Sequence, residues 1–424
     1  MKRHFEVIVV GAGPAGIAAA VSAAEAGSSV ALLDDNPAPG GQIWRNGAPL
    51  PSSAQYWLAK LAASSITRFP GSRVYAHPKP GVISAERDDG AIDLHYDKLI
   101  LATGARELFL PFPGWTLPNV FGAGGLDAMV RGGLPIAGKR IVVAGTGPLL
   151  LAVAAHLAGH GAKVVAICEQ APFARLAAFG ARMLMQPEKL RQGISYRWAA
   201  REAHMHFSCW PVAAKGAAEL ESVRLRQGNH EWNVPCDYLA CGFHLVPNTE
   251  LARMLGCRIE DGFVAVDQFQ QTSAADVLSA GEPTGIGGVE LALLQGQIAG
   301  LAAAGRANAA QKLIAQRRRM SGFVPALRET YRLNPLLRKL PSHATLVCRC
   351  EDVAFSALHE HASWRDAKLH TRCGMGPCQG RICGAAVEFL FDWSVDSVRP
   401  PIFPALVSSL AQAGVSSTDS MEDL

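Results

Sequence analysis

The sequence predicts an α/β protein that combines two nucleotide-binding folds with a small C-terminal domain that binds a metal. Three observations support this prediction. A buried strand followed by a glycine-rich turn and an alanine-rich helix opens the chain, a weaker copy of that pattern begins at Arg140, and half of the 10 cysteines fall between Cys348 and Cys383. At 424 residues the chain exceeds what one hydrophobic core usually organises, so several domains are expected.

Composition and charge exclude several classes of function. Hydrophobic residues make up 49% of the chain and charged residues 18%, which is typical of a packed protein and not of a disordered one. Lys and Arg number 40 against 36 Asp and Glu, and they are scattered except for Arg317–Arg319, so a nucleic-acid partner is not expected. That run is expected to be a solvated helix face. No apolar run is long enough for a transmembrane segment, and the N-terminal glycines indicate a turn and not a signal peptide. We expect a cytoplasmic protein.

The first nucleotide-binding fold begins with the apolar run Phe5–Val10, which is typical of a strand buried in a parallel sheet. In the Gly-x-Gly-x-x-Gly turn that follows, the first glycine permits a tight turn, the second lets the backbone approach a pyrophosphate, and the third allows close helix packing. About 18 residues further on, Asp34 is placed to bind an adenosine ribose. Its neighbour Asp35 is a second candidate, with solvation of the turn as the alternative. The expected contacts of the dinucleotide are Gly11, Gly13, Pro14, Ala15, Gly16, Asp34 and Asp35.

Three further segments, Pro39–Gln42, Leu101–Ala105 and Ser279–Glu282, complete a pattern that covers about three quarters of the chain. Together with the first turn they resemble the flavoproteins with two dinucleotide-binding domains, the superfamily of glutathione and thioredoxin reductases. The resemblance implies two Rossmann-like three-layer domains and bound FAD. That family usually has aspartate where this chain has Glu282, so the role of this longer side chain is open. The further FAD contacts that the resemblance implies are Gly41, Gln42, Thr103, Gly104, Gly281 and Glu282.

The second nucleotide-binding fold is a degraded copy of the first. After the strand Arg140–Ala144 comes Gly145-Thr146-Gly147, but Leu150 stands where a third small residue would allow close packing. Glu169 occupies the position of the ribose-binding carboxylate and would disfavour the 2'-phosphate of NADP. The family resemblance implies a nicotinamide domain, whereas the residues support only its fold. NAD or another adenine nucleotide is therefore left open as a ligand of this site.

The clustered cysteines indicate an iron-sulfur site. Cys348 and Cys350 are separated by one residue, and about 22 residues later a glycine-rich loop carries Cys373 and Cys378. Four thiolates in this arrangement suit a [2Fe-2S] cluster, whereas zinc sites usually separate paired cysteines by about two to four residues. We expect these four cysteines to be the metal ligands and Cys383 to pack nearby.

The segments around these cysteines, including Thr371-Arg372-Cys373-Gly374-Met375-Gly376-Pro377-Cys378, closely resemble the small helical ferredoxin-like domain first named for bacterioferritin-associated ferredoxin (BFD). Basic residues near the thiols could offset the negative charge of a cluster, with surface solvation as the alternative. These residues are Arg349, Arg372 and Arg381.

A chain with both groups can convert electron pairs into single electrons, because a flavin accepts a hydride whereas a [2Fe-2S] cluster passes one electron at a time. No Cys-x-x-Cys occurs in the flavin and nicotinamide regions, which excludes the disulfide chemistry of thioredoxin reductases. The order of motifs resembles the alpha, or A, subunit of opine oxidases, hydrogen cyanide synthase and hydroxyproline or proline dehydrogenase complexes.

In that group a separate FAD-containing beta subunit oxidises the amino acid or opine, and the alpha subunit carries electrons onward. The resemblance therefore implies an FAD-dependent oxidoreductase that serves for electron transfer within a complex. Its candidate partners are the beta subunit, which contains FAD, together with a small ferredoxin-like subunit. No catalytic acid or base can be nominated from the sequence. Two alternatives stay open: a self-contained NADH-dependent reductase that uses the cluster, and a redox-sensing or scaffold subunit.

The expected domain boundaries follow from these motifs. An FAD-binding domain comprises residues 1–115 and 235–320, with an NAD(P)-binding-like domain inserted at 116–234. A helical linker at 321–342 leads to the BFD-like [2Fe-2S] domain at 343–402, and a tail occupies 403–424. The tail is expected either to pack on its own chain or to dock a partner.

Overall fold

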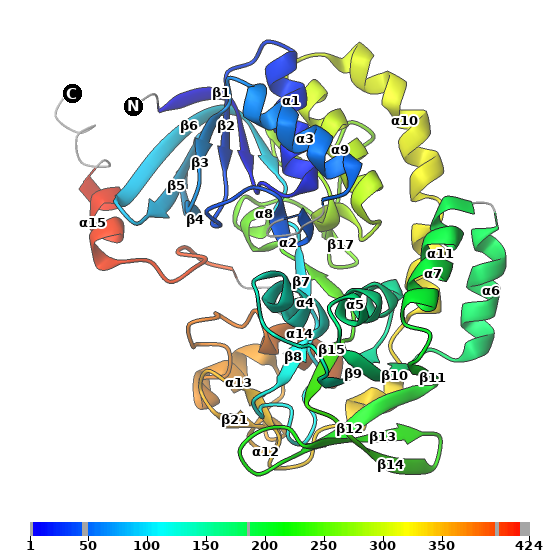
Figure 1. Cartoon of the computed structure of the whole chain (residues 1–424). Coiled ribbons are helices and arrows are strands. Elements are labelled where there is room, and N and C mark those ends of the chain that lie inside the picture. The colour runs from blue at the N-terminus through cyan, green and yellow to red at the C-terminus, as the bar shows by residue number, and fades with distance from the viewer. Residues whose placement is uncertain (1–2, 45–49, 185–186, 395–397, 416–424) are drawn as a thin grey trace. The chain divides into compact units, whose positions relative to one another are not determined.

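The computed structural model describes residues 3–44, 50–184, 187–394 and 398–415 (Figure 1). The chain forms two compact units. The first unit comprises Met1–Arg106, Pro247–Val324 and Ser397–Leu424, and the second comprises Glu107–Val246 and Pro325–Asp396. The chain therefore passes from one unit to the other four times. Among the described residues no helix is both long and apolar enough to cross a membrane.

The first unit is built on a seven-stranded sheet in the order β3-β2-β1-β6-β5-β4, with β19 also paired to β6. β1 is parallel to β2 and β6, and β19 is parallel to β6, whereas β4, β5 and β6 form an antiparallel meander. Burial of the central parallel strands on both faces explains their continuous runs of Val, Ile and Leu. The strands are β1 (His4–Val10), β2 (Val30–Leu33), β3 (Thr67–Phe69), β4 (Arg73–Lys79), β5 (Val82–Arg87), β6 (Gly90–Leu101) and β19 (Val277–Ser279).

Three helices pack on one face of this sheet (Figure 1). α1 and α9 approach so closely that two positions of α9 must be glycine. A Cβ at Gly296 would lie 2.1 Å from the carbonyl oxygen of Ala15, and a Cβ at Gly300 would lie 2.2 Å from that of Ala19. This contact fixes the start of α1, where the first glycine turn lies. The three helices are α1 (Pro14–Glu25), α3 (Ser52–Ala63) and α9 (Val289–Ala303).

Smaller elements complete the first unit. In α10, Arg317 donates a hydrogen bond to the carbonyl oxygen of Asp267 (3.2 Å), and Arg318 donates one to the side chain of Gln268 (3.4 Å). Arg317 is thus half-buried against a neighbouring loop, whereas Arg318 and Arg319 are exposed, as expected for a solvated helix face. The elements are α2 (Gly41–Trp44), α8 (Glu250–Met254), β17 (Ile259–Glu260), β18 (Phe263–Val264), η1 (Glu282–Thr284), α10 (Ala307–Ser321) and α15 (Val407–Val415).

The second unit contains a five-stranded parallel sheet in the order β11-β10-β9-β15-β8 and a three-stranded antiparallel sheet β12-β13-β14. A short pair, β7 (Ala105–Glu107) and β16 (Leu245–Pro247), lies where the chain enters and leaves this unit. The other strands are β8 (Val120–Gly122), β9 (Arg140–Gly145), β10 (Lys163–Glu169), β11 (His204–Phe207), β12 (Cys209–Lys215), β13 (Ser222–Gln227), β14 (His230–Pro235) and β15 (Tyr238–Gly242). The helices of this part are α4 (Ala123–Arg131), α5 (Pro148–Gly159), α6 (Phe173–Met183) and α7 (Pro187–Ala199).

The cysteine-bearing segment shares a core with this second nucleotide fold. Leu337 and Leu340 are buried in the same cluster as Trp115 and Val142, and the indole nitrogen of Trp115 donates to the carbonyl oxygen of Leu346 at 2.6 Å. Of the segment expected as a linker, residues 325–342 therefore belong to the second unit. The elements are α11 (Val324–Thr330), η2 (Pro335–Lys339), β20 (Leu346–Cys348), β21 (Val353–Ala354), α12 (Phe355–Leu358), α13 (Trp364–Thr371) and α14 (Cys383–Phe391).

The last described residues return to the first unit. The backbone N–H of Ile402 donates to the carbonyl oxygen of Tyr75 (2.9 Å), and the Tyr75 hydroxyl donates to that of Ser409 (3.1 Å). The Glu86 carboxylate accepts from the backbone N–H of Leu406 (2.7 Å) and the hydroxyl of Ser409 (2.6 Å). Residues 402–409 are thus held on the meander of the first sheet.

Candidate functional site

The first glycine turn leaves space for a ligand at one of its three glycines. A Cβ at Gly11 (φ +107°) would lie 2.2 Å from the carbonyl oxygen of Ala102, and a Cβ at Gly16 would lie 1.7 Å from that of Gly11. At Gly13 the nearest atom to an added Cβ is the Cα of Gly41, 3.9 Å away. The protein's own packing therefore requires the first and third glycines, whereas the second borders open space. This is the geometry that pyrophosphate binding needs.

Helix α1 starts directly at this open space. Gly13 is its N-cap without a side-chain cap, and Pro14 follows in the first turn, so N–H groups at this helix end are free of side-chain partners. Ala15 is buried, and its Cβ would lie 2.7 Å from a Cβ at Gly281. The side chain of Ala15 therefore packs against the last flavin motif, which leaves only its backbone to face a cofactor.

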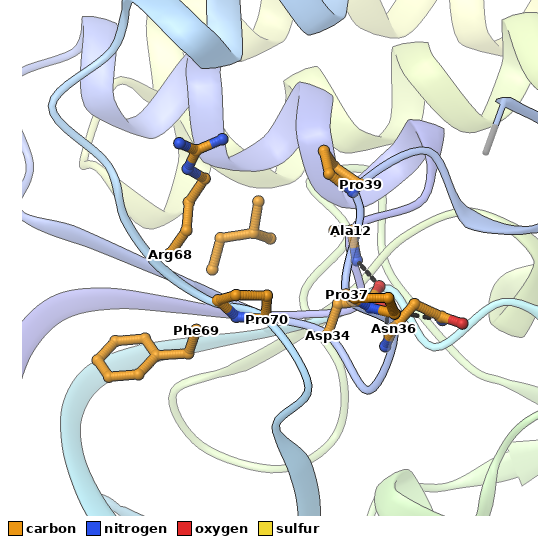
Figure 2. A pocket seen from close by; sticks show the side chains of 9 residues that line it. Ala12, Asp34, Asn36, Pro37, Pro39, Arg68, Phe69 and Pro70 are labelled. Carbon is orange, nitrogen blue, oxygen red and sulfur yellow. Dashed lines mark hydrogen bonds between the residues drawn. The ribbon is translucent and has the colours of Figure 1, made fainter. Parts of the chain in front are cut away.

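Asp34 lies at the carboxyl end of β2 and forms part of a cavity of about 300 Å³ (Figure 2). Its carboxylate accepts from the backbone N–H of Ala12 (2.5 Å) and from the backbone and side-chain nitrogens of Asn36 (2.8 and 2.7 Å). Figure 2 shows Arg68 across the cavity from Asp34. Mostly apolar walls with one carboxylate suit an adenine ring and its ribose. The lining residues are Ala12, Leu32, Asp34, Asn36, Pro37, Pro39, Arg68, Phe69 and Pro70.

The second acid behaves differently from the first. Asp35 is exposed, is not among the residues that line the cavity, and accepts from the side chain of Asn36 at 2.9 Å. The structure therefore brings Asp34 to the cavity and leaves Asp35 at the surface of the turn.

The loop Pro39–Gln42 lies directly against the glycine turn. The N–H of Gly40 donates to the carbonyl oxygen of Ala12 at 2.8 Å. A Cβ at Gly41 (φ +59°) would lie 2.9 Å from the Cα of Gly13. Only glycine fits this contact, and the adjoining Gln42 is exposed. The loop thus borders the space next to Gly13.

The two crossover segments of the first unit are held together by an asparagine that the motifs did not indicate. The Thr103 hydroxyl donates to the carbonyl oxygen of Asn248 (2.6 Å), and the Asn248 side chain donates back to that of Thr103 (2.8 Å). Gly104 has φ +68° and accepts from the N–H of Asn248 at 3.0 Å. Asn248 follows β16 in the sequence, and only the pairing of β16 with β7 reveals its position.

The last flavin motif is also shaped by close packing. Gly281 has φ +81°, and its N–H donates to the side chain of the buried Gln295 at 3.1 Å. Glu282 is partly buried, and this burial raises the pKa of its carboxyl. Helix α9 begins after Gly288 without a side-chain cap, and its first turn carries Glu290, whose charge complements the positive end of the helix dipole.

The cysteines of the C-terminal segment converge. The Sγ atoms of Cys348, Cys373 and Cys383 lie within 4.8 Å of one another, and all three residues are buried. Cys378 is partly exposed and Cys350 is exposed. The structure therefore brings Cys383 into contact with the predicted ligands, and five thiols are available for a site that needs four.

Hydrogen bonds to the sulfurs of Cys348 and Cys378 favour their ionised form, which is the form that binds metals, whereas the hydrogen bond with Cys348 raises the pKa of Cys373 to about 12. The thiols of Cys373 and Cys383, followed by backbone N–H groups, lower the pKa of Cys348 to about 2. The thiol of Cys383, again with backbone N–H groups, lowers the pKa of Cys378 to about 5. Backbone N–H donors of this kind stabilise the negative charge of a thiolate-ligated cluster. The residues that donate them are Glu351 and Gly374 to Cys348, and Gly380 and Ile382 to Cys378.

The glycine-rich loop closes over the thiols. A Cβ at Gly376 would lie 2.2 Å from the Cβ of Cys350, and a Cβ at Gly374 (φ +80°) would lie 2.6 Å from the ring of Trp364. The glycines of this motif are therefore required to bring the loop onto Cys350. We consider the fit to a [2Fe-2S] cluster good, because the thiols converge, accept backbone hydrogen bonds and lie under a tightly packed loop.

The nearby arginines are already engaged. The Arg349 guanidinium lies 5.4 Å from the centre of the Trp115 ring, and Arg372 donates to Glu351 at 2.7 Å. Arg381 makes a long hydrogen bond of 3.4 Å to the carbonyl oxygen of Cys378. Among these three interactions, the hydrogen bond of Arg381 is the one made to a cysteine.

Comparison with known proteins agrees with this geometry. The family model described as pyridine nucleotide-disulphide oxidoreductase matches residues 5–309. The A subunit of opine oxidase from Rhizobium meliloti (strain 1021) is 30% identical over 451 residues, which cover 96% of this chain and 98% of that protein. The HcnB subunit of hydrogen cyanide synthase from Pseudomonas aeruginosa is 30% identical over 422 residues, covering 90% of this chain and 91% of that protein.

Solved structures show the same fold. L-proline dehydrogenase from P. horikoshii superposes with a TM-score of 0.67 at 18% identity, covering 96% of this chain and 79% of that chain. Thioredoxin reductase from T. acidophilum gives a TM-score of 0.57 at 21% identity, covering 72% and 99%. The predicted fold class and the predicted family resemblance are both confirmed.

Proposed function

The chain belongs to the pyridine nucleotide-disulphide oxidoreductase family and is an FAD-dependent oxidoreductase, and we propose that it is the electron-transfer subunit of an amino-acid or opine dehydrogenase complex. The relatives with high coverage are named as subunits of opine oxidase and hydrogen cyanide synthase. Full-length similarity to such subunits supports a role within a complex. The substrate would be oxidised on a separate FAD-containing beta subunit, and the complex would also contain a small ferredoxin-like subunit.

One observation carries this proposal: a flavin-type site and a convergent group of thiols occur in the same chain. A bound flavin accepts electrons in pairs, and a [2Fe-2S] cluster passes them singly. FAD would be held by the first glycine turn, by Asp34, and by the loops at Gly41, Thr103 and Gly281. The sequence contains no Cys-x-x-Cys beside this flavin site, so a dithiol relay is not an alternative there.

For the cluster we propose the ligand set that the spacing predicts, Cys348, Cys350, Cys373 and Cys378. Cys383 is the competing candidate, because its sulfur lies within 4.8 Å of those of both Cys348 and Cys373. Glycines 374 and 376 let the loop fold over the thiols, and the backbone N–H groups stabilise the ligands as thiolates. The bound cluster would supply one-electron transfer at the exposed edge marked by Cys350.

The ligand set is tested with single serine variants of the anaerobically purified full-length chain, assayed for iron, acid-labile sulfide and the cluster's EPR signal. Cys373→Ser is expected to lose the cluster and Cys383→Ser to keep it. The buried Cys257→Ser, far from this group in the sequence, is the matched control and should keep both iron and FAD. If Cys383→Ser loses the cluster and Cys373→Ser keeps it, Cys383 replaces Cys373 in the ligand set. If the purified chain contains zinc in place of iron, the electron-transfer role is wrong.

The complex itself is tested by purifying the native assembly and assaying it with proline, hydroxyproline, glycine and opines in the presence of a dye acceptor. The proposal expects flavin in this chain to be reduced by one of these substrates only when the partner is present. A complex in which no such substrate reduces any flavin would instead favour a sensing or scaffold subunit.

A further inference from the structure

The acid of the second nucleotide fold is enclosed by the protein. Glu169 is 3% exposed, whereas its counterpart Asp34 borders an open cavity. The Glu169 carboxylate accepts from the Thr146 hydroxyl (2.6 Å) and from the backbone N–H groups of Gly147 (2.8 Å) and Ala171 (2.8 Å). Its lone pairs are thus directed at the protein, and not at a place where a ribose could lie.

The second glycine turn has a different conformation from the first. Gly13 has φ −75°, whereas Gly147 at the matching position has φ +107°. In the first fold the acid accepts from the residue between the two glycines, Ala12, and in the second it accepts from Gly147 itself. The backbone N–H of Gly147 corresponds to that of Gly13, which borders the space for a phosphate in the first fold. In the second fold this N–H donates to Glu169 instead. The buried Leu150, 1% exposed, replaces the third glycine in the adjoining helix.

A segment from the far end of the second unit lies over this turn. The Gln170 side chain donates to the Thr146 hydroxyl (3.0 Å) and to the carbonyl oxygen of Arg332 (3.3 Å), and its oxygen accepts from the backbone N–H of Asn334 (2.9 Å). His244 Nε2 lies 2.9 Å from the carbonyl oxygen of Tyr331, with which it can share a hydrogen bond. Residues 331–334 are thus held where an approaching adenosine would have to enter.

A second carboxylate occupies the edge of the sheet where ligands bind in this fold class. The Glu107 carboxylate accepts from the backbone N–H groups of Gly124 (2.7 Å) and Gly125 (3.0 Å) at the start of α4. β8 ends at Gly122 and β15 ends at Gly242. A Cβ at Gly122 would lie 2.4 Å from a carboxylate oxygen of Glu107, and a Cβ at Gly242 would lie 3.7 Å from the other. The helix end that could receive a phosphate already binds the protein's own carboxyl group.

We infer that the second nucleotide fold of this chain is closed by its own residues, so that it binds no nicotinamide nucleotide, and that it serves as the platform of the cluster domain. This rests on the proposed function, in which an electron pair reaches the flavin from a substrate oxidised on the partner. The platform role follows from the shared core of Leu337 and Leu340 and from the bond between Trp115 and Leu346. The family's nicotinamide nucleotide and the residues of this chain therefore do not fit each other.

The test uses the full-length chain loaded with FAD and purified anaerobically. NADH, NADPH and ADP are titrated separately to about millimolar concentration by calorimetry, and NADH and NADPH are mixed with the chain in a stopped-flow instrument while flavin absorbance is recorded. No saturable heat and no flavin bleaching are expected, whereas dithionite should bleach the flavin fully. Saturable binding of any of the three nucleotides, ADP included, or flavin reduction by NADH or NADPH would overturn the closed fold.

The role of residues 331–334 in covering the second glycine turn is tested with Gln170→Ala, which removes the side chain that connects these residues to the turn. Limited proteolysis of the segment 325–342 is expected to accelerate roughly tenfold, because cleavage follows local opening. FAD content should stay unchanged. Gln192→Ala, an exposed glutamine of α7 in the same unit, is the control and should leave cleavage unaffected. Equal cleavage rates in Gln170→Ala and the unsubstituted chain would contradict the proposal that residues 331–334 cover the turn.

The two proposals fail in different ways. If the closed fold is wrong, NADH or ADP binds while the complex still oxidises its substrate through the partner. If the proposed function is wrong, the chain lacks iron and sulfide or the complex lacks dehydrogenase activity, although the nucleotides still do not bind.

Discussion

Replacing Glu169 with glutamine should make the stability of the chain less dependent on pH. Burial raises the pKa of the Glu169 carboxyl from 4.5 to about 7, although hydrogen bonds from Thr146 and neighbouring N–H groups oppose this shift. A carboxyl with a raised folded pKa stabilises the fold most when it is protonated in both states. That contribution is present below the unfolded pKa and is lost as the pH rises through the folded pKa.

The size of the effect follows from the two pKa values. A pKa of about 7 in place of 4.5 corresponds to roughly 3 kcal/mol over the whole titration, of which about 2 kcal/mol is lost between pH 5.5 and pH 8. Tyr331 is the other titratable group that faces Glu169, and burial raises the pKa of its hydroxyl, so it stays neutral over this range. Glutamine cannot ionise, and Glu169→Gln should remove the loss.

The assay is urea unfolding followed by tryptophan fluorescence at both pH values, for the unsubstituted chain and for Glu169→Gln. The free energy of unfolding of the unsubstituted chain, relative to the variant, should fall by about 2 kcal/mol from pH 5.5 to pH 8. Glu202→Gln, an exposed glutamate of the same unit, is the control and should show no such difference. Identical pH dependence in the unsubstituted chain and Glu169→Gln would refute the assignment of Glu169 as an enclosed acid.

Three further predictions follow from the geometry. Asp34→Ala should weaken FAD binding by about tenfold or more, because a charge-assisted hydrogen bond contributes about 1.5 to 3 kcal/mol. The measurement is the FAD-to-protein ratio after dialysis, which should stay normal in the control Asp35→Ala. Equal loss of FAD in both variants would contradict the assignment of Asp34 as the ribose-binding acid. Gly376→Ala should lower the iron and sulfide content without changing the FAD content, because its Cβ would lie 2.2 Å from that of Cys350. Full iron content in this variant would show that the loop can shift to accommodate the Cβ. Glu86→Ala should destabilise the chain by about 1 to 2 kcal/mol and speed cleavage within residues 398–415, because it removes the acceptor at the start of α15; an unchanged cleavage pattern would show that the anchor is dispensable.

The first nucleotide fold could be predicted from local sequence because its determinants are local. The strand before Gly11, the spacing of the glycines and the acid Asp34 each encode a backbone geometry within one strand-turn-helix unit. The prediction of a two-domain flavoprotein fold is confirmed, since it needed only this unit and its weaker copy. Thr103 and Gly104 were placed by resemblance, yet their partner Asn248 depends on a strand pair formed far along the chain.

The second fold shows why the remainder could not be predicted. Gly145-Thr146-Gly147 has the same glycine spacing as Gly11-Ala12-Gly13, but the two turns differ in φ at the second glycine. The contacts that cover the second glycine turn come from Gln170 and a segment more than 160 residues away. No spacing rule encodes such a contact. The ambiguity of Cys383 has a similar origin, because it is the start of helix α14 that directs this thiol toward the others.

The four passages of the chain between the units have a consequence for biosynthesis. The first sheet receives its strand β19 only after the whole of residues 107–246 has been synthesised, and the core of the second unit receives Leu337 and Leu340 later still. Neither unit can therefore complete its folding while the C-terminal third is on the ribosome, and both must form from contacts distant in sequence. A cut after residue 246 or after residue 324 would divide both units, so that each contiguous fragment would lack part of each core and should aggregate when it is expressed alone.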